Sequence, residues 1–274
     1  NSSCPCNAGE PRGTAIISHS LASNLNNTVY GGQSMYVFEG STPKSRGTIC
    51  LVAKETATGK LVGLTNNHVL GAYTSTSSAK ITIPDNLKRN YRQALTLIPS
   101  ISPCLNTAGN YSGSYGESYK TIPFPTTSLA FQIAVDAGLF SINTDWAATD
   151  IHEIGTGGHE WLTLAELGGN PSSLIGKPVY KTGATTGTKA LIGKITYVNN
   201  ISQASYVNES NNTISYQLTN QIIIEPITST LYLCESVMSL AGDSGSPILV
   251  EINGTLKVVG ILWGGNATLM LYVQ

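Results

Sequence analysis

A serine in a glycine-rich loop is the strongest chemical signal in the sequence. Residues 241–247 read AGDSGSP, and an apolar run, ILV, follows at 248–250. A serine between two glycines can present its hydroxyl at a surface, while nearby backbone N–H groups, unblocked by side chains, could hold an oxyanion. Read alone, the same residues also fit an ordinary glycine-rich β-turn. A nucleophilic Ser244 therefore needs partners elsewhere in the chain.

A histidine and an aspartate each lie beside an apolar run. Residues 64–70 read LTNNHVL and contain His68, and residues 134–139 read AVDAGL and contain Asp136. A histidine can take the proton of a serine hydroxyl while a carboxylate orients the imidazole, and the chain order His, Asp, Ser distinguishes one class of convergent triads. We therefore expect His68 as base, Asp136 as orienting acid and Ser244 as nucleophile.

The elements that must position these residues are short β-strands. Runs rich in β-branched and aromatic residues alternate with turn formers such as TGK at 58–60 and NGT at 253–255, which is typical of antiparallel hairpins. We expect strands at residues 34–38, 48–53, 61–65, 81–84, 133–142, 189–198, 214–224, 248–252 and 256–263. The one expected helix covers residues 161–167, where apolar residues recur at helical spacing.

That helix lies in a segment between two β-rich units. We expect an N-terminal extension at 1–33, a first β unit at 34–142, a crossover at 143–175 and a second β unit at 176–274. Two β units of similar size are compatible with a duplicated barrel. At 274 residues the chain is too short for three ordinary domains.

Composition and charge exclude several classes of function. Fifteen Lys and Arg against 16 Asp and Glu give a net charge of −1 without a basic face, so a nucleic-acid partner is not expected. The longest apolar runs, such as 129–135, are far too short to span a bilayer. A polar cluster in the crossover matches no zinc-ligand spacing and is expected to be a solvated loop; it comprises Asp150, His152, Glu153, His159 and Glu160.

Two further patterns point to an extracellular or cell-surface protein. Asn-x-Ser/Thr glycosylation acceptors occur at Asn1, Asn26, Asn110, Asn200, Asn208, Asn211, Asn253 and Asn266. A sequence rich in Asn, Ser and Thr also generates such triplets by chance. Five cysteines without a CxxC suit two disulfides and one free thiol; they are Cys4, Cys6, Cys50, Cys104 and Cys234. We expect glycans on some acceptors and at least one disulfide.

Taken in order, these motifs resemble those of the trypsin/chymotrypsin-like serine peptidases, in the bacterial or viral-type branch. The resemblance covers nearly all of residues 34–274. GDSGSP is highly specific, TNNHV is fairly specific, and VDAGLFSI is weak unless taken with the others. VYKTGATTG at 179–187 is similar to the opening strand and turn of the family's second barrel, and GILWGG at 260–265 to the strand that pairs with substrate backbone.

The resemblance implies an all-β fold of two antiparallel six-stranded β-barrels with the active site in the cleft between them. His68 and Asp136 would come from the first barrel and Ser244 from the second, and the N–H groups of Gly242 and Ser244 would form the oxyanion hole. The implied activity is that of a serine endopeptidase, which hydrolyses a polypeptide substrate through an acyl-enzyme. It requires neither a metal nor an organic cofactor.

The resemblance also implies which residues bind substrate. The residue six before the nucleophile lies at the base of the primary pocket in that family, and here it is Met238. Leu262, Trp263 and Gly264 would line the substrate strand. Because Met238 offers no carboxylate, a buried cationic side chain would lack a counter-ion. We therefore expect cleavage after a medium or large apolar residue rather than after Lys or Arg.

The sequence departs from the family pattern at three points. Asn67 stands where the animal enzymes carry a small alanine, and Ser246 replaces a glycine of the commoner GDSGGP. No Ile-Val-Gly-Gly start supplies an amine for Asp243, so activation by that insertion is not expected. An alternative stays open, a non-enzymatic trypsin-like scaffold that self-assembles in a glycosylated surface or fibrous structure. An unrelated carbohydrate-binding β module would leave the ordered triad a coincidence.

Overall fold

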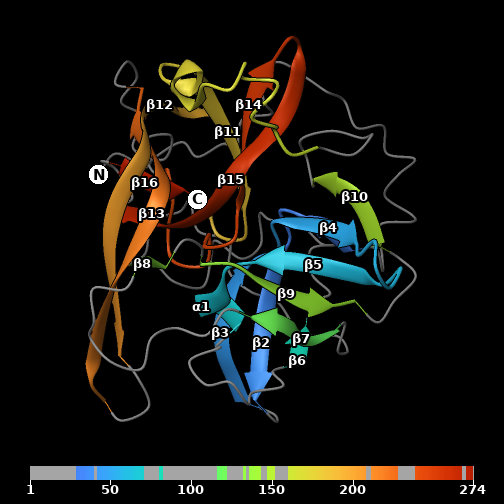
Figure 1. Cartoon of the computed structure of the whole chain (residues 1–274). Helices are drawn as coiled ribbons and strands as arrows, with labels where there is room; N and C mark the ends of the chain where they lie inside the picture. The colour runs from blue at the N-terminus through green and yellow to red at the C-terminus, as the bar shows by residue number, and fades with distance from the viewer. Residues whose placement is uncertain are drawn as a thin grey trace, which may run out of the picture.

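Short strands dominate this computed structural model, in which β-sheet far exceeds helix. The structure describes residues 29–39, 42–70, 80–82, 116–121, 132–133, 136–142, 147–151, 160–207, 211–227, 238–266 and 270–273. Within these ranges the helices are α1 (Asn67–Leu70) and a single 3-10 turn, η5 (Pro171–Leu174). Neither is long and apolar enough to cross a membrane. Figure 1 shows two β lobes, one above the other.

The first lobe is a seven-stranded antiparallel sheet with the order β3-β2-β6-β7-β9-β5-β4. Its strands are β2 (Ser34–Glu39), β3 (Thr42–Thr48), β4 (Leu51–Lys54), β5 (Leu61–Thr65), β6 (Lys80–Thr82), β7 (Gly116–Thr121) and β9 (Gly138–Ser141). Its core packs residues from several strands and α1 together, including Met35, Ile49, Leu70 and Phe140, all fully buried. Helix α1 is thereby anchored through its apolar residues.

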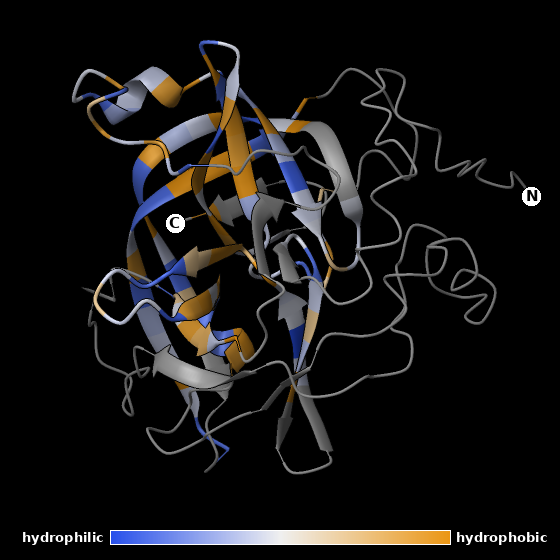
Figure 2. Ribbon diagram, turned by 90° about the vertical axis from the view of Figure 1, so that its right-hand side faces the viewer, coloured by the Kyte–Doolittle hydropathy of each residue, from blue (hydrophilic) through white to orange (hydrophobic). Residues whose placement is uncertain are grey.

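The second lobe is also seven-stranded, with the order β12-β11-β14-β15-β16-β13-β8. Its strands are β8 (Gln132–Ile133), β11 (Pro178–Gly183), β12 (Gly187–Val207), β13 (Thr213–Pro226), β14 (Pro247–Ile252), β15 (Thr255–Asn266) and β16 (Met270–Val273). Because β12 pairs with β13 as well as with β11, the pairings of six strands run in a ring. Figure 2 shows hydrophobic and hydrophilic residues interleaved along the strands, as expected where one strand face is buried.

Two features join the lobes. An apolar cluster takes Cys50 and Leu51 from the first lobe and Leu249, Val258 and Ile261 from the second. In addition, β8 comes from the first half of the chain and pairs in parallel with β13 of the second lobe. A further parallel pair, β1 (Val29–Gly31) with β10 (Ala147–Ile151), lies outside both sheets. Asp136 therefore follows a strand that pairs in the second lobe and precedes β9 of the first lobe.

The fold differs from the sequence-based expectation in two respects. The described strands form two seven-stranded sheets with one parallel pairing in the second, rather than two antiparallel sets of six. The helix expected over residues 161–167 is replaced by successive turns, whose i+3→i hydrogen bonds of 2.9–3.2 Å have Glu166, Leu167 and Gly168 as donors. Gly168 and Gly169 then adopt φ of +62° and +78°, which a right-handed helix cannot continue through.

Candidate active site

His68 and Asp136 form a tightly held pair at the edge of the first lobe. His68 lies on α1, and its Nδ1 is 2.6 Å from Asp136 Oδ2. The backbone N–H of His68 donates to the other carboxylate oxygen, Oδ1, at 3.0 Å. The Asp136 side chain is fully buried, whereas the imidazole is 27% exposed. With Nδ1 committed to the carboxylate, Nε2 is the ring nitrogen that can exchange a proton with a bound group.

The backbone of Asp136 is held as firmly as its carboxylate. Its carbonyl accepts a hydrogen bond from the side-chain Nδ2 of Asn66 at 2.8 Å and one from the backbone N–H of Asn67 at 3.4 Å. Three consecutive residues, 66 to 68, thus hold both the backbone carbonyl and the side-chain carboxylate of Asp136. Asn66 was missed by sequence reasoning, although a fully buried asparagine at the end of an apolar strand calls for a specific hydrogen-bond partner.

Ser244 lies in the loop before β14. Strand β3 contacts both this loop and α1. A Cβ atom at Gly47 of β3 would lie 2.4 Å from Val69 Cγ1, on the residue after His68, and 3.1 Å from the Ser244 carbonyl oxygen. The loop and the helix therefore meet on the same short stretch of β3. Within the described residues, no hydrogen bond joins the Ser244 side chain to His68. The structure brings His68 and Asp136 together and places Ser244 close to the helix that carries His68.

Strand β3 holds the serine loop through a series of hydrogen bonds across the lobe interface. The N–H of Thr48 donates to the Ser244 carbonyl at 2.7 Å, and the Thr48 hydroxyl donates to the Gly242 carbonyl at 2.9 Å. That hydroxyl also accepts from the N–H of Ala184 at 2.9 Å, and Arg46 Nη2 donates to the Ala184 carbonyl at 2.7 Å. The first lobe thereby fixes the loop that carries the candidate nucleophile.

Glycines stand on both sides of Ser244 near the two candidate oxyanion donors, the N–H groups of Gly242 and Ser244. Gly242 adopts a φ of +98° and Gly245 a φ of +93°, so both need glycine's conformational freedom. A Cβ at Gly245 would also lie 2.0 Å from the Thr48 carbonyl oxygen. Among the described residues, none accepts a hydrogen bond from the N–H of Gly242 or of Ser244. Both residues are partly exposed rather than buried, which fits N–H groups that donate to a ligand.

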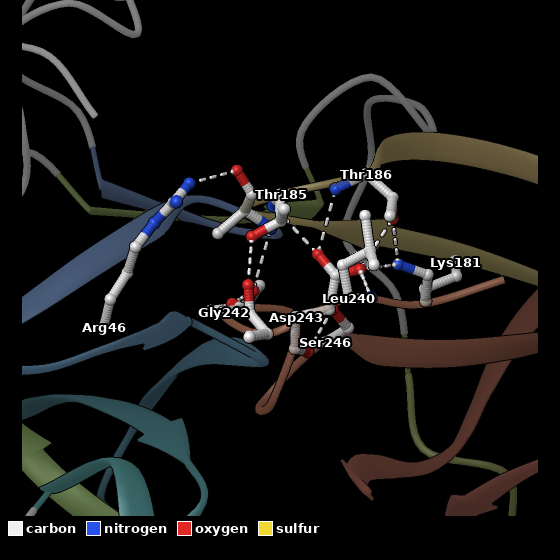
Figure 3. Close-up of polar contacts among 11 residues, drawn as sticks. Arg46, Lys181, Thr185, Thr186, Leu240, Gly242, Asp243 and Ser246 are labelled. Carbon is white, nitrogen blue, oxygen red and sulfur yellow. Dashed lines mark hydrogen bonds and ion pairs between the residues drawn. The ribbon is translucent and has the colours of Figure 1, made fainter. Parts of the chain in front are cut away.

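Asp243, directly before Ser244, is the centre of a buried polar network (Figure 3). Its Oδ2 accepts from Lys181 Nζ at 2.9 Å, from the Thr186 hydroxyl at 2.7 Å and from the N–H of Leu240 at 3.0 Å. Its Oδ1 accepts from the N–H groups of Thr185 and Thr186 at 2.8 and 3.1 Å. Lys181 and Asp243 are both fully buried, so this is an interior ion pair with well-satisfied oxygens.

The network keeps Asp243 ionised. Burial on its own would raise the pKa of Asp243, but the Lys181 ammonium and the hydrogen bonds from Thr186 and Thr185 hold that pKa below its usual value. Burial also lowers the pKa of Lys181, and the attraction of Asp243 offsets this only in part. Lys181 was not recognised from sequence as part of the site. The available signal was one lysine inside the otherwise uncharged run VYKTGATTG.

The candidate substrate-binding residues are divided between core and surface. Met238 and Leu262 are buried among the apolar side chains of the second lobe. Trp263 is half-buried, and its indole N–H donates to the side-chain oxygen of the fully buried Gln221. Nothing lies within 4 Å of where a Cβ on Gly264 would be, which leaves the backbone there accessible. Gln221 is a second residue that sequence reasoning missed.

The remaining sequence-based candidates that lie within the described residues do not join this site. Glu160 is 81% exposed and pairs with Lys257 at 2.7 Å, and no cluster of three metal-ligating residues occurs within the described ranges. Cys50 is a buried free thiol whose pKa is raised by burial. Asn211 and Asn253 are exposed, while Asn200 is half-buried and Asn266 lies on β15. The positions outside the described residues are Asn1, Asn26, Asn110, Asn208, His152, Glu153, His159, Cys4, Cys6, Cys104 and Cys234.

Comparison with known proteins gives structural neighbours only. No protein-family model matches the chain, and no curated protein does. Protease A of Thermobifida fusca is 15% identical, with 90% of this chain and 91% of that chain covered, at a TM-score of 0.47. The Nocardiopsis protease NAPase is 16% identical, with 90% of this chain and 92% of that chain covered, at a TM-score of 0.47. Cellulomonas bogoriensis chymotrypsin is 15% identical, with 90% of this chain and 91% of that chain covered, at a TM-score of 0.44. The solved structures to which this chain is similar include bacterial serine proteases of the trypsin/chymotrypsin-like kind.

Proposed function

We propose that this protein is a serine endopeptidase with Ser244 as nucleophile, His68 as general base and Asp136 as the acid that orients it. The observation that carries the proposal is the 2.6 Å contact between His68 Nδ1 and a carboxylate that is fully buried. A second support is the serine loop, whose N–H groups at Gly242 and Ser244 are available to a ligand. The loop is fastened to the β3 stretch against which α1 also packs.

The residues can carry out acyl transfer in two balanced steps. Ser244 Oγ attacks the peptide carbonyl carbon while His68 Nε2 takes the hydroxyl proton, and the oxygen's negative charge is stabilised by the N–H groups of Gly242 and Ser244. The C–N bond then breaks, and His68 gives its proton to the leaving amine. Water then attacks the acyl-enzyme carbonyl while His68 takes its proton, the ester C–O bond breaks, and His68 returns the proton to Ser244 Oγ. Asp136 keeps Nδ1–H oriented and stabilises the imidazolium in both steps.

The architecture that accompanies this proposal is the two-barrel arrangement of that family. We infer that residues 34–142 and 176–274 form the two barrels and that residues 143–175 connect them. The ring of strand pairings in the second lobe supports this inference. A second support is the apolar cluster around Cys50 and Leu249, which takes residues from both lobes.

Labelling with a fluorophosphonate probe tests the proposed function. The probe is expected to modify Ser244 in the folded protein and to be found on that residue by peptide mass mapping. Ser244→Ala and His68→Ala should both abolish labelling, because the hydroxyl needs its base to react. A folded protein that takes up no probe would contradict the peptidase proposal and favour the scaffold alternative.

Specificity gives a prediction that depends on the fully buried Met238. A peptide library is expected to be cleaved after medium or large apolar residues, because Met238 is polarisable and presents no counter-ion to a buried cation. Sequencing of the cleaved peptides measures this preference. A dominant preference for Lys or Arg would show that another acid reaches the pocket and that Met238 does not form its base.

Location gives a second prediction, which rests on the acceptor triplets and the cysteines. We propose an extracellular or cell-surface glycoprotein, with glycans at Asn211 and Asn253 because both lie exposed. Intact-mass measurement of the native protein should show a loss on deglycosylation and at least one disulfide, whereas Cys50 should react with alkylating agents only after unfolding. A bare and fully reduced native protein would contradict this location.

A further inference from the structure

We propose that two hydroxyls, those of Thr185 and Ser246, act as positioning residues that aim the oxyanion-hole N–H groups at the substrate. The inference rests on the proposed peptidase function and adds to it two residues outside the triad and the hole. Each hydroxyl bonds the carbonyl of the peptide unit whose N–H is a candidate donor. Because a trans peptide is planar, its carbonyl and N–H point in opposite directions, so fixing the carbonyl also fixes the N–H.

Thr185 controls the donor at Gly242. The peptide unit that contains the Gly242 N–H has the carbonyl of Ala241 at its other end, and the Thr185 hydroxyl donates to that carbonyl at 2.7 Å (Figure 3). Thr185 is itself immobilised, because it is buried and its own N–H donates to Asp243 at 2.8 Å. The Gly242 N–H is therefore held through a side chain anchored on the interior ion pair.

Ser246 controls the donor at Ser244 in the same way. The peptide unit that contains the Ser244 N–H has the carbonyl of Asp243 at its other end. That carbonyl accepts from the N–H of Ser246 at 2.9 Å and from the Ser246 hydroxyl at 2.6 Å. Ser246 is fully buried. Gly183 makes room for this hydroxyl, since a Cβ there would lie 2.6 Å from Ser246 Oγ.

This assignment gives a physical role to a departure from the commoner motif. A glycine in place of Ser246 would keep the backbone hydrogen bond to the Asp243 carbonyl but lose the hydroxyl bond. Donors that are fixed before the reaction stabilise the developing oxyanion without reorganising, which is where most of their catalytic value lies. Loss of either positioning hydroxyl should therefore weaken binding of the transition state more than binding of the substrate.

The test compares Thr185→Val, Thr185→Ser and Ser246→Ala with the wild-type chain on one peptide substrate and on a peptide aldehyde, which forms a tetrahedral adduct. Thr185→Val and Ser246→Ala are each expected to lower kcat by about 10-fold, less than the 10²–10³-fold for loss of a donor itself. KM should stay unchanged, and the inhibition constant of the aldehyde should rise by the same factor as kcat/KM falls. Thr185→Ser should restore most of the loss, because it retains the hydroxyl.

Matched controls separate positioning from packing. Thr196→Val removes a hydroxyl of β12 that makes only a 3.4 Å contact with the Ile223 carbonyl. Ser202→Ala removes a buried hydroxyl that has no hydrogen-bond partner among the described residues. Both should leave kcat and the aldehyde inhibition constant unchanged.

Three results would overturn the inference while wild-type Ser244 still labels with fluorophosphonate. These are a rise in KM at constant kcat, equal losses in Thr185→Ser and Thr185→Val, or a lowered melting temperature with unchanged kcat. If the folded wild-type protein takes up no fluorophosphonate, the proposed function itself fails and this inference falls with it.

Discussion

Ser244→Ala and His68→Ala are each expected to lower kcat by roughly 10⁶-fold, and Asp136→Asn by roughly 10⁴-fold, the magnitudes measured for such triads in other serine peptidases. The first two changes remove the nucleophile and its base outright. Asp136 has one oxygen on the His68 backbone N–H and the other on Nδ1. An asparagine that keeps the first bond turns its NH₂ towards Nδ1, which favours the wrong imidazole tautomer.

The double variant Ser244→Ala/His68→Ala provides the sharper test. Because the two residues act on one proton, the pair should lose little more than either single variant does. The measurement is kcat/KM for all four proteins on the same peptide, with circular dichroism and melting temperature as controls for folding. Losses that multiply would mean that Ser244 and His68 act independently, and a shared triad would then be the wrong description.

The strands were predictable where a local apolar pattern determines them. The runs expected at 61–65 and 248–252 correspond to β5 and β14 to within one residue, because these strands are largely buried. The long β12 was expected at 189–198 and continues to Val207. Its residues 199–207 are stabilised by pairing with β13 rather than by their own composition. The single-turn helix α1 was not expected at all, because four residues show no periodicity.

The sequence alone could identify some residues of the candidate site but not others. Ser244 and His68 lie in short motifs that carry their own signal, whereas Asp136 needed the chain order to select it. Lys181 and Asn66 could not be found in this way. Lys181 contacts Asp243 from 62 residues away and Asn66 contacts Asp136 from 70 residues away, and only the folded chain shows that these polar side chains are buried together.

Lys181→Met is expected to destabilise the folded protein by about 3–5 kcal/mol, because it leaves the Asp243 charge buried without its partner. Burial is the largest influence on the pKa of both Lys181 and Asp243. Whichever partner is removed, the charged side chain that remains is therefore costly to bury. Asp243→Asn should be destabilising for the same reason. The double variant Lys181→Met/Asp243→Asn should recover part of the loss, since no unpaired charge remains. Urea unfolding of the four proteins at neutral pH measures these differences.

The pH dependence of this effect follows from the pKa of Asp243, which is lowered in the folded wild-type protein. Its contribution to stability is therefore fully present above the unfolded-state pKa of about 4 and is lost as the pH falls through the lower folded value. In Lys181→Met, burial without the ammonium should instead raise that pKa, so protonation should stabilise this variant relative to the wild type. The difference in unfolding free energy should thus begin to shrink above about pH 4, as the pH falls through the raised pKa of Asp243 in the variant, and continue to shrink down to the lowered wild-type value. Lys257→Met, which breaks ion pairs with the exposed Glu160 and the partly exposed Glu166, is the matched control and should leave the urea midpoint nearly unchanged. A difference between wild type and Lys181→Met that stays constant from neutral pH into acid would mean that lost packing of the lysine stem, rather than an unpaired carboxylate, causes the destabilisation.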